Sequence, residues 1–509
     1  MKKFFLLTLT ILFSLALFAC GSEATTSTKA KQNTTKQPGQ TTKRDNSTVV
    51  TTKKVGNPTF WDKDGNGVED WLEEEITLRF ATWAYNDYAN DTIDSLMAQA
   101  FTLKYPNIKV EMQLVGQDYE FEENMIALLD ATVEGEESPI PDVFLINRLA
   151  NFLPYGFLAD ITQYYDNDPD TEYIFESVKS SGIFDGKRYA IPTFIYPTIY
   201  FVNLTILKNA GIDIPSYNWT WDQMEAIGSA AYNETRHIFG IYGTSGYTRE
   251  LTKVLKGDNT WSASSFDGTK FNFDDQVWDL AFARLKEGID KKAVQPTLGA
   301  ETLEEYYNDG TIDPRYAGYA AIWRDATWAA KEFFDTMDFE WDVYPGPNGI
   351  SGGNTDIAGV SALSTHKAAA YQLLKWMTYG EDGILTRFSL YEQYKDVLFM
   401  SGNNYPFPIV DYGIDLEGHN KIWESIPYGS TAPALMSSGM LASLKNGALW
   451  LNKEVVGWDA VDTVVNPYFY ALETGEYNSY AEVRSQIVTG ATEAYNQATQ
   501  ALRDLINLN

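Results

Sequence analysis

The sequence predicts an α/β fold with a mainly parallel sheet, and three observations support this. Strand-like and helix-like apolar patterns alternate from residue 76 onward. The body, residues 76–509, is too long for one hydrophobic core. With 44% hydrophobic and 21% charged residues, the composition is that of an ordinary globular protein. We therefore expect at least two domains, with ligands at the carboxyl ends of the strands.

The elements of the body follow from their apolar spacing. Residues 76–83 alternate apolar and polar side chains, which is typical of a half-buried strand. Residues 93–101 carry apolar side chains at helical spacing. The next strands are predicted at 108–114 and 142–146, with a helix at about 121–132 between them. Strands and helices that alternate in this order favour a parallel sheet.

Residues 189–203 form a long apolar segment that Pro192 and Pro197 interrupt. Because proline cannot donate a ladder hydrogen bond, this segment is a poor central strand but suits a crossing between domains. Further on, Thr220 and Gln223 have the spacing of a capping box, which predicts a helix that begins after Thr220.

The N-terminal residues predict export and a tether. Two lysines precede an apolar run that is too short for a membrane span, and the small Ala19 precedes Cys20, the only cysteine. This order resembles a bacterial lipoprotein signal, in which residues 1–19 are removed and Cys20 carries the lipid, with palmitate among its acyl groups. Residues 20–58 contain almost no apolar side chain and are expected to form a disordered tether that spans roughly 30–35 Å.

The charge distribution limits the classes of partner that the protein can bind. Residues 1–55 hold nine Lys or Arg and two acidic residues, which gives this segment a net charge of +7. Because the whole chain has a net charge of −30, the remaining residues carry −37. Such an acidic body repels nucleic acid, whereas the basic tether is attracted to anionic lipid headgroups. We therefore expect no nucleic-acid partner. The single cysteine also excludes a disulfide within the chain.

Residues 59–75 contain an EF-hand-like calcium loop. The predicted oxygen ligands are Asp62, Asp64, Asn66, Val68 through its backbone carbonyl, Asp70 through water, and Glu73. Gly67 occupies the position of the sharp turn. The incoming helix of a full EF-hand is absent because Asn57 and Pro58 precede the loop. We interpret Ca²⁺ as a structural ion that fixes the tether to the body, and the alternative is an acidic turn that binds no ion.

Several segments of the body resemble, in content and order, an extracellular solute-binding protein of an ABC importer, of the family 1 maltose or sugar type. These segments are 142–144, 156–162, 185–192, 207–215, 221–222, 320–328 and 344–347. The resemblance implies a two-lobed periplasmic-binding-protein-like fold (type II) with discontinuous lobes joined by hinge strands. Lobe 1 would comprise residues 76–197 and 350–398, and lobe 2 would comprise 198–349 and 399–509.

The resemblance also implies a function. A sugar or oligosaccharide would be enclosed between the lobes and passed to the membrane permease of an ABC importer. The protein would be a monomer, lipid-anchored at the extracellular face of the bacterial cytoplasmic membrane.

A sugar site needs flat aromatic side chains together with carboxylate, amide and Arg groups. The 14 Trp and 32 Tyr supply ample aromatics, but many of these belong to cores, so position selects the candidates. At the ends of predicted strands lie Trp83, Asn86, Asp87, Asn147 and Arg148. By the resemblance, the further candidates are Tyr196 in the crossing segment, Trp328, and Trp323, Arg324 and Asp325 in the same turn. Trp458 and Asp459 either line the cleft or face solvent.

Two other classes stay open. A secreted carbohydrate-active enzyme needs paired acidic groups, and composition alone does not exclude them. However, the three histidines show neither zinc spacing nor a nucleophile elbow. Residues 240–246 lack the Lys-Ser/Thr ending of a phosphate loop and are interpreted as a plain turn. A calcium-stabilised surface adhesin is the second alternative, indicated by the tether and the calcium loop.

Overall fold

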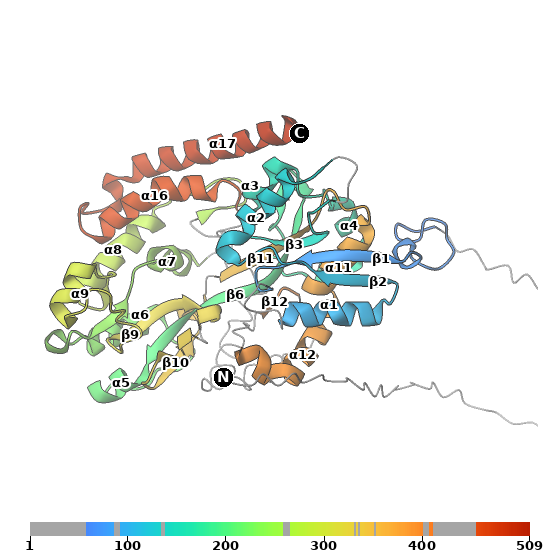
Figure 1. The fold of residues 1–509 in the computed structure, drawn as a ribbon. Helices are drawn as coiled ribbons and strands as arrows, with labels where there is room; N and C mark the ends of the chain where they lie inside the picture. The colour runs from blue at the N-terminus through green and yellow to red at the C-terminus, as the bar shows by residue number, and fades with distance from the viewer. Residues whose placement is uncertain are drawn as a thin grey trace, which may run out of the picture. The chain divides into compact units, whose positions relative to one another are not determined.

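The computed structural model describes residues 58–85, 92–133, 138–257, 265–329, 332–333, 336–350, 353–400, 407–410 and 455–508 (Figure 1). Contacts divide the chain into residues 1–54 and 55–509, and all described elements belong to the second unit. The predicted signal segment and Cys20 lie outside the described residues. Within the described ranges, no helix combines the length and apolar character of a membrane span.

Most of the strands belong to one mixed sheet. They are β1 (Ile76–Ala81), β2 (Ile108–Met112), β3 (Val143–Ile146), β6 (Ala190–Asn203), β7 (Phe239–Tyr242), β8 (Val294–Gln295), β9 (Ala320–Ala326), β10 (Trp341–Tyr344), β11 (Gly353–Val360) and β12 (Phe407–Pro408). Their order is β2-β1-β3-β11-β6-β9-β7-β8, and β10 and β12 also pair with β6. β4 (Ile183–Phe184) and β5 (Lys187–Arg188) form a separate hairpin.

The predicted strands at 76–83, 108–114 and 142–146 are confirmed as β1, β2 and β3. β1 is parallel to both of its neighbours, and β7 is parallel to β8 and β9. The expectation of a mainly parallel sheet was wrong for its centre, where β11 is antiparallel to β3 and β6, and β6 is antiparallel to β9. The strands at both edges of the sheet are therefore parallel to their neighbours, whereas the central strands β3, β11, β6 and β9 are paired antiparallel.

The crossing segment is the 14-residue strand β6, and its two halves have different partners. Residues 190–197 pair with β11, whereas residues 198–203 pair with β9 on one side and β10 on the other. The strand is central in spite of its prolines. Pro192 lies at the register shift of β11, and Pro197 is the last residue that pairs with β11, so neither interrupts a regular ladder.

We call the part around β1, β2, β3 and β11 lobe 1. Its helices are α1 (Ile93–Lys104), α2 (Asp118–Asp130), α3 (Leu149–Phe152), α4 (Thr162–Asp166), α11 (Lys367–Thr378) and α12 (Glu381–Met400). The predicted helices at 93–101 and about 121–132 are confirmed as α1 and α2. Thr92 begins α1 with a capping box, because its side chain accepts a hydrogen bond from the backbone N–H of Ser95 and the Ser95 hydroxyl accepts one in return.

We call the part around β7, β8, β9 and β10 lobe 2. Its helices are α5 (Leu204–Ala210), α6 (Trp221–Ala231), α7 (Tyr247–Lys256), α8 (Val277–Asp290), α9 (Ala300–Tyr307), α16 (Trp458–Glu473) and α17 (Arg484–Leu508). The predicted capping box of Thr220 and Gln223 is confirmed at the start of α6, with hydrogen bonds of 2.8 and 3.2 Å. The residue boundaries between the lobes stay a prediction.

Helix α17 connects the lobes a second time, as Figure 1 shows. Its first turns lie in the core of lobe 2, where Ile487 is fully buried. Its last turns contact the short helix η2 (Leu153–Tyr155) of lobe 1, where Leu502 is buried. The Arg503 guanidinium forms an ion pair of 2.8 Å with Asp185 in the turn between β4 and β5. The lobes are thus joined by both β6 and α17.

Candidate functional site

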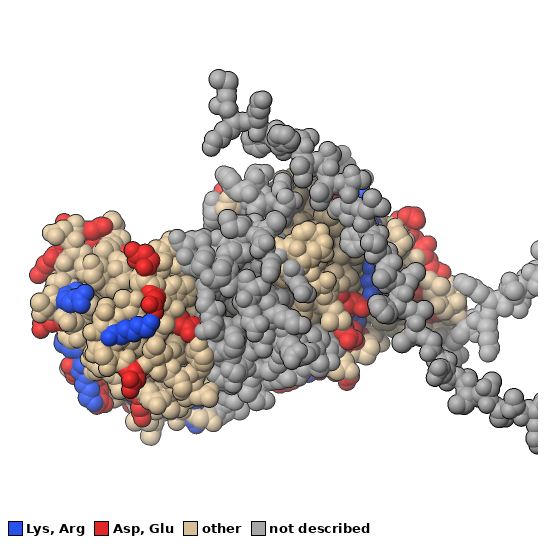
Figure 2. Space-filling view, turned by 90° about the horizontal axis from the view of Figure 1, so that it is seen from below, with Lys and Arg blue, Asp and Glu red and all other residues tan. Residues whose placement is uncertain are grey.

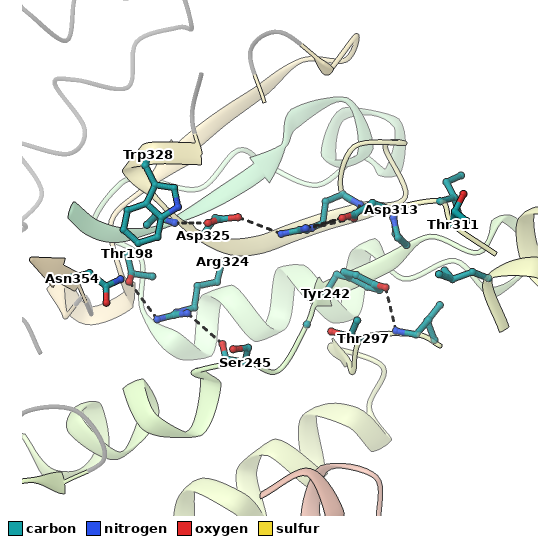
Figure 3. A pocket seen from close by; sticks show the side chains of 17 residues that line it. Thr198, Tyr242, Ser245, Thr297, Thr311, Asp313, Arg324, Asp325, Trp328 and Asn354 are labelled. Atoms are coloured by element: carbon teal, nitrogen blue, oxygen red, sulfur yellow. Dashed lines mark hydrogen bonds and ion pairs between the residues drawn. The ribbon is translucent and has the colours of Figure 1, made fainter. Parts of the chain in front are cut away.

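A cavity of about 530 Å³ opens where β6, β7 and β9 meet. This size is typical of a small-molecule site. Its lining comes almost entirely from lobe 2, with Asn354 of β11 from lobe 1 (Figure 3). The polar and aromatic side chains of the lining are Thr198, Tyr242, Ser245, Thr297, Thr311, Asp313, Arg315, Arg324, Asp325, Trp328 and Asn354.

The aromatic part of the cavity is Trp328, which lies in the short helix η6 (Thr327–Ala329) directly after β9. Its side chain is 39% exposed, which is unusual for a tryptophan in this fold, and its ring lies 5.6 Å from that of Tyr196. Tyr196 pairs in register with Asn354. Two aromatic rings and an amide thus stand beside one another at the crossing strand.

A buried charge network forms the floor beneath Arg324. The Arg324 Nε–H donates to Glu250 Oε1 at 2.6 Å, and its Nη2 donates to Thr198 Oγ1 at 3.3 Å. Glu250 is fully buried and also accepts a hydrogen bond of 2.5 Å from the Tyr200 hydroxyl. Burial, reinforced by the Glu250 carboxylate, raises the pKa of Tyr200 well above its usual value, so this hydroxyl stays a donor.

A second charge network lies on the side wall. Arg315 donates to Asp313 Oδ2 at 2.7 Å and lies 3.3 Å from Asp325 Oδ2. Asp325 Oδ1 accepts the backbone N–H of Ala326 at 2.8 Å. Burial raises the pKa of the Asp325 carboxyl above its usual value, although this N–H and Arg315 act in the opposite direction. Each cation of the cavity is therefore paired with a carboxylate.

The structure brings four of the sequence candidates together. Trp328, Arg324 and Asp325 line the cavity, and Tyr196 contacts Trp328. Trp323, from the same segment, is placed elsewhere: it is 0% exposed and stacks on Phe201 with ring centroids 5.5 Å apart. Trp323, Arg324 and Asp325 lie in strand β9 and not in a turn as predicted. Because adjacent side chains of a strand point to opposite faces, Trp323 points into the core while its neighbour Arg324 faces the cavity.

The candidates at the ends of β1 and β3 form a separate group. Trp83 packs edge-on against Phe121 at 5.7 Å, and Asn147 is half-buried. Arg148 forms an ion pair of 2.9 Å with Asp459, the second residue of α16. Trp83, Asn147 and Arg148 are absent from the lining of the cavity. Asn86 and Asp87 lie outside the described residues.

Trp458 and Asp459 differ in placement. Trp458 is buried, with the Arg249 guanidinium 5.0 Å from its ring centroid. Asp459 is exposed but paired with Arg148 of the other lobe. Its charge is therefore used in a contact between lobe 1 and the start of α16.

Sequence reasoning missed most of the polar lining. The interpretation of residues 240–246 as a plain turn was wrong, because β7 runs from Phe239 to Tyr242 and the following residues Gly243 and Ser245 line the cavity. The short apolar run 238–242 was the available signal. No sequence signal indicated Thr198 or Asn354, because only the pairing of β6 with β9 and β11 brings these two residues to the cavity.

The predicted calcium loop folds around Asn66. Its backbone N–H donates to Asp62 and Asp64 at 3.0 and 2.9 Å, and its side-chain amide donates to Asp64 and Glu73 at 2.9 and 2.6 Å. Gly67, with φ of +87°, donates to Asp62 Oδ2. In the described part of the chain, no three His, Cys, Asp or Glu side chains are grouped closely enough to hold a metal. The predicted ligands of the loop are of more kinds than these, because they also include the Asn66 amide and the Val68 backbone carbonyl.

Two tryptophans attach this loop to lobe 1. Trp61 donates to the Asn167 carbonyl at 3.2 Å and stacks on Tyr371 at 5.8 Å. Trp71 is buried and contacts Tyr105 edge-on. The loop that carries the acidic side chains is thus attached to aromatic residues of lobe 1, of which Tyr371 is fully buried.

The fold is of the two-lobed periplasmic-binding-protein-like type. It resembles the cyclic α-maltosyl-1,6-maltose binding protein from Arthrobacter globiformis (TM-score 0.60, 15% identity, 83% of this chain and 99% of that one). It also resembles an ABC substrate-binding protein from Listeria monocytogenes solved in complex with cycloalternan (TM-score 0.57, 18% identity, 83% and 99%). At these identities the likeness concerns the fold alone.

Sequence comparison identifies the family. The profile of the bacterial extracellular solute-binding proteins matches residues 85–379, and the chain belongs to this family. An arabinooligosaccharide-binding protein of Bacillus subtilis is 28% identical over 243 residues, 46% of this chain and 52% of that protein. The diacetylchitobiose binding protein DasA of Streptomyces coelicolor is 25% identical over 335 residues, 62% and 72%. The chain thus spans about half the length of the first of these relatives.

The raised pKa of Asp325 predicts how stability depends on pH. Because burial disfavours the charged carboxylate, ionised Asp325 opposes folding above its folded-state pKa. This cost is absent below the unfolded-state pKa, about 3.9, where the carboxyl is protonated in both states. We expect Asp325→Asn to melt at a higher temperature than the parent at pH 7, with the difference vanishing toward pH 3.5. In this variant Arg315 still has a carboxylate partner, because its hydrogen bond to Asp313 is kept.

Asp309→Asn is the control of opposite sign. Hydrogen bonds from Thr311 hold the pKa of Asp309 below its usual value, so its ionised form favours folding above the unfolded-state pKa, and this contribution is lost as pH falls through the folded-state pKa. Asp309→Asn should therefore lower the melting temperature at pH 7. Calorimetry from pH 3.5 to 8 measures both variants, and an Asp325→Asn protein that melts below the parent at pH 7 would contradict the assignment.

Proposed function

We propose that this protein captures an uncharged oligosaccharide in the cavity at β6 and delivers it to the membrane permease of an ABC importer. The observation that supports this most directly is the exposed ring of Trp328, beside Tyr196, in a cavity whose other groups are hydroxyls, amides and charge pairs. The names of the relatives, which bind arabino-oligosaccharides and diacetylchitobiose, agree with this ligand class.

The chemistry of the lining suits a sugar. A pyranose presents an apolar C–H face that stacks on an aromatic ring, and its rim of hydroxyls donates and accepts hydrogen bonds. Trp328 supplies the flat surface, while Asn354, Asp325 and Arg324 supply donors and acceptors around it. Asn354 belongs to lobe 1 and the other three to lobe 2, so a ligand that contacts them all is held by both lobes and favours the closed form.

We propose binding without catalysis, because the family is one of binding proteins. The charges on the outside are consistent with a small ligand as the partner. On the face seen in Figure 2, acidic and basic side chains are interspersed over the described surface of lobe 2, and no extended basic patch is visible there. Nucleic acid requires such a patch.

The stacking role of Trp328 is tested by Trp328→Ala. We expect glycan affinity to fall about ten- to hundred-fold, because a central aromatic contact of this kind contributes strongly to binding. Trp328→Phe should retain most of the affinity. Trp341→Phe, at the start of β10 and outside the cavity lining, is the matched control and should bind as the parent does. Calorimetric titration with a glycan panel measures this, and unchanged affinity of Trp328→Ala or release of reducing sugar would contradict the proposal.

We propose that the protein is held at the extracellular face of the bacterial cytoplasmic membrane by a lipid on Cys20. The support is the order of lysines, apolar run, Ala19 and Cys20, followed by a polar tether. The Cys20→Ser variant should move from the membrane fraction to the medium, whereas Ser22→Ala should stay membrane-bound. Mass spectrometry of the mature N-terminus provides the direct readout, and an unmodified Cys20 in the parent protein would end the proposal.

We propose that the loop from Asp62 to Glu73 binds Ca²⁺ as a structural ion. Its residues fit the ion by the chemistry of the donor set, since calcium takes six to eight hard oxygens and this loop offers carboxylates, an amide and a backbone carbonyl. Binding would replace the hydrogen bonds that now link Asn66 to Asp64 and Glu73. Because Trp61 and Trp71 attach the loop to lobe 1, bound calcium would also stabilise that lobe.

Calcium at 10 mM should stabilise the parent by about 1.4–2.7 kcal/mol, given the weak affinity of extracellular loops of this kind. The variants Asp62→Ala and Glu73→Ala should show no such increase. Asp290→Ala, which changes an exposed acidic residue at the end of α8 in lobe 2, is the control and should respond as the parent does. Denaturant unfolding with and without calcium measures the effect. If calcium does not change the unfolding of the parent protein, the proposal of a calcium site is contradicted.

A further inference from the structure

Glu250 is a buried carboxylate that the proposed ligand contacts do not include. It lies in the first turn of α7, is 0% exposed, and bridges two strands by accepting from Tyr200 of β6 and Arg324 of β9. Burying a carboxylate is costly unless it is paired and hydrogen-bonded, and here both conditions are met. Its partner Arg324 lines the cavity.

Arg324 has donors to spare. A guanidinium carries five N–H groups. Glu250 accepts the one on Nε, the Ser245 carbonyl lies 3.5 Å from Nη1, and Thr198 Oγ1 lies 3.3 Å from Nη2. Among the described residues, at least two terminal N–H groups therefore have no acceptor. Figure 3 shows the guanidinium extended between Thr198 and Ser245 within the cavity.

The backbone at Gly246 also packs closely against the Arg324 guanidinium. Gly246 caps the N-terminus of α7 with φ of +76°, and a Cβ atom added there would lie 2.8 Å from Arg324 Cζ. Only glycine permits this approach. The N-terminus of a helix carries partial positive charge and disfavours a cation, so the charge of Glu250 is needed to keep Arg324 in this place.

We propose that Glu250 is a positioning residue of the cavity that sets its preference for uncharged over anionic sugars. It orients Arg324 so that the free N–H groups donate to neighbouring hydroxyl oxygens of the glycan. It also cancels the charge of Arg324, so that a uronate gains little from the cation. This inference rests on the proposed function, because it assigns a role at the same cavity.

The variant Glu250→Gln keeps the shape of the side chain and removes its charge. Calorimetric titrations use three neutral probes, arabinotriose, maltotetraose and N,N′-diacetylchitobiose, and the anionic digalacturonate. We expect the best neutral ligand of the parent to bind Glu250→Gln about ten- to hundred-fold more weakly, as when one partner of a buried charge pair is lost. The ratio of neutral to digalacturonate affinity should fall at least ten-fold.

Asp168→Asn is the matched control. Asp168 is equally buried and likewise accepts from a tyrosine, Tyr379 at 2.7 Å, and a cation, Lys375 at 2.8 Å, but it lies outside the cavity lining in lobe 1. This variant should lose stability and keep the parent's affinities and their ratio. An equal loss of glycan affinity in Asp168→Asn and Glu250→Gln would show a general effect of stability and overturn the inference.

Gly246→Ala keeps the test decisive should Glu250→Gln fail to fold. Its Cβ displaces the guanidinium, and we expect the same fall in neutral-glycan affinity. Gly257→Ala, at the other end of α7, is the control: it also has positive φ, of +62°, and a Cβ there would meet nothing within 4 Å.

The outcomes separate the two proposals. The inference is overturned, while sugar binding stands, if Glu250→Gln keeps the parent's affinity for the neutral glycans and its ratio of neutral to digalacturonate affinity. It is also overturned if Gly246→Ala keeps the parent's affinity for the neutral glycans. A parent that prefers digalacturonate to every neutral probe overturns the inference and also the uncharged character of the ligand in the proposed function, while sugar binding stands. A parent that binds none of the four probes overturns the proposed function and the inference with it.

Discussion

The crossing strand β6 is the constraint on which the site depends. Its first half is hydrogen-bonded into lobe 1 and its second half into lobe 2, so the residues at the change of partner have positions fixed by both. Because side chains on one face of a strand recur every second residue, Tyr196, Thr198 and Tyr200 point to the same side. They contact Trp328, Arg324 and Glu250 respectively. One strand thereby aligns the aromatic, cationic and acidic parts of the cavity.

Charge pairing is the second organising feature of the cavity. Arg324 is paired with Glu250, and Arg315 is paired with Asp313 and Asp325, so no cation of the described lining carries an unbalanced charge. Such pairs are costly to bury and add little to stability. They offer directed hydrogen-bond donors and acceptors without a strong field, which suits a ligand with many hydroxyls and no charge. The fold's stability comes instead from the apolar cores beneath the sheet.

Local features of the sequence were predictable, and features that depend on pairing were not. Periodicity placed β1, β2, β3 and their helices, and spacing identified the cap at Thr220. Trp328 was found because the resemblance to the family places a stacking tryptophan at this interval, and Arg324 and Asp325 were found because they lie close to it. Trp323 was included because it lies next to them, although its side chain points away from that of Arg324 and into the core. Asn354 and Thr198 lie in segments distant in sequence, and only the order β11-β6-β9 reveals that they line one cavity.

The central claim is that two lobes sharing β6 close around a glycan. Two ion pairs between them, Arg148 with Asp459 and Arg503 with Asp185, lie on exposed side chains, where ion pairs are weak enough to rearrange during a hinge motion. Small-angle X-ray scattering of the mature protein, with and without a glycan that binds in titration, measures this directly. The account predicts a smaller radius of gyration with the glycan. An unchanged scattering profile at saturating glycan would contradict it.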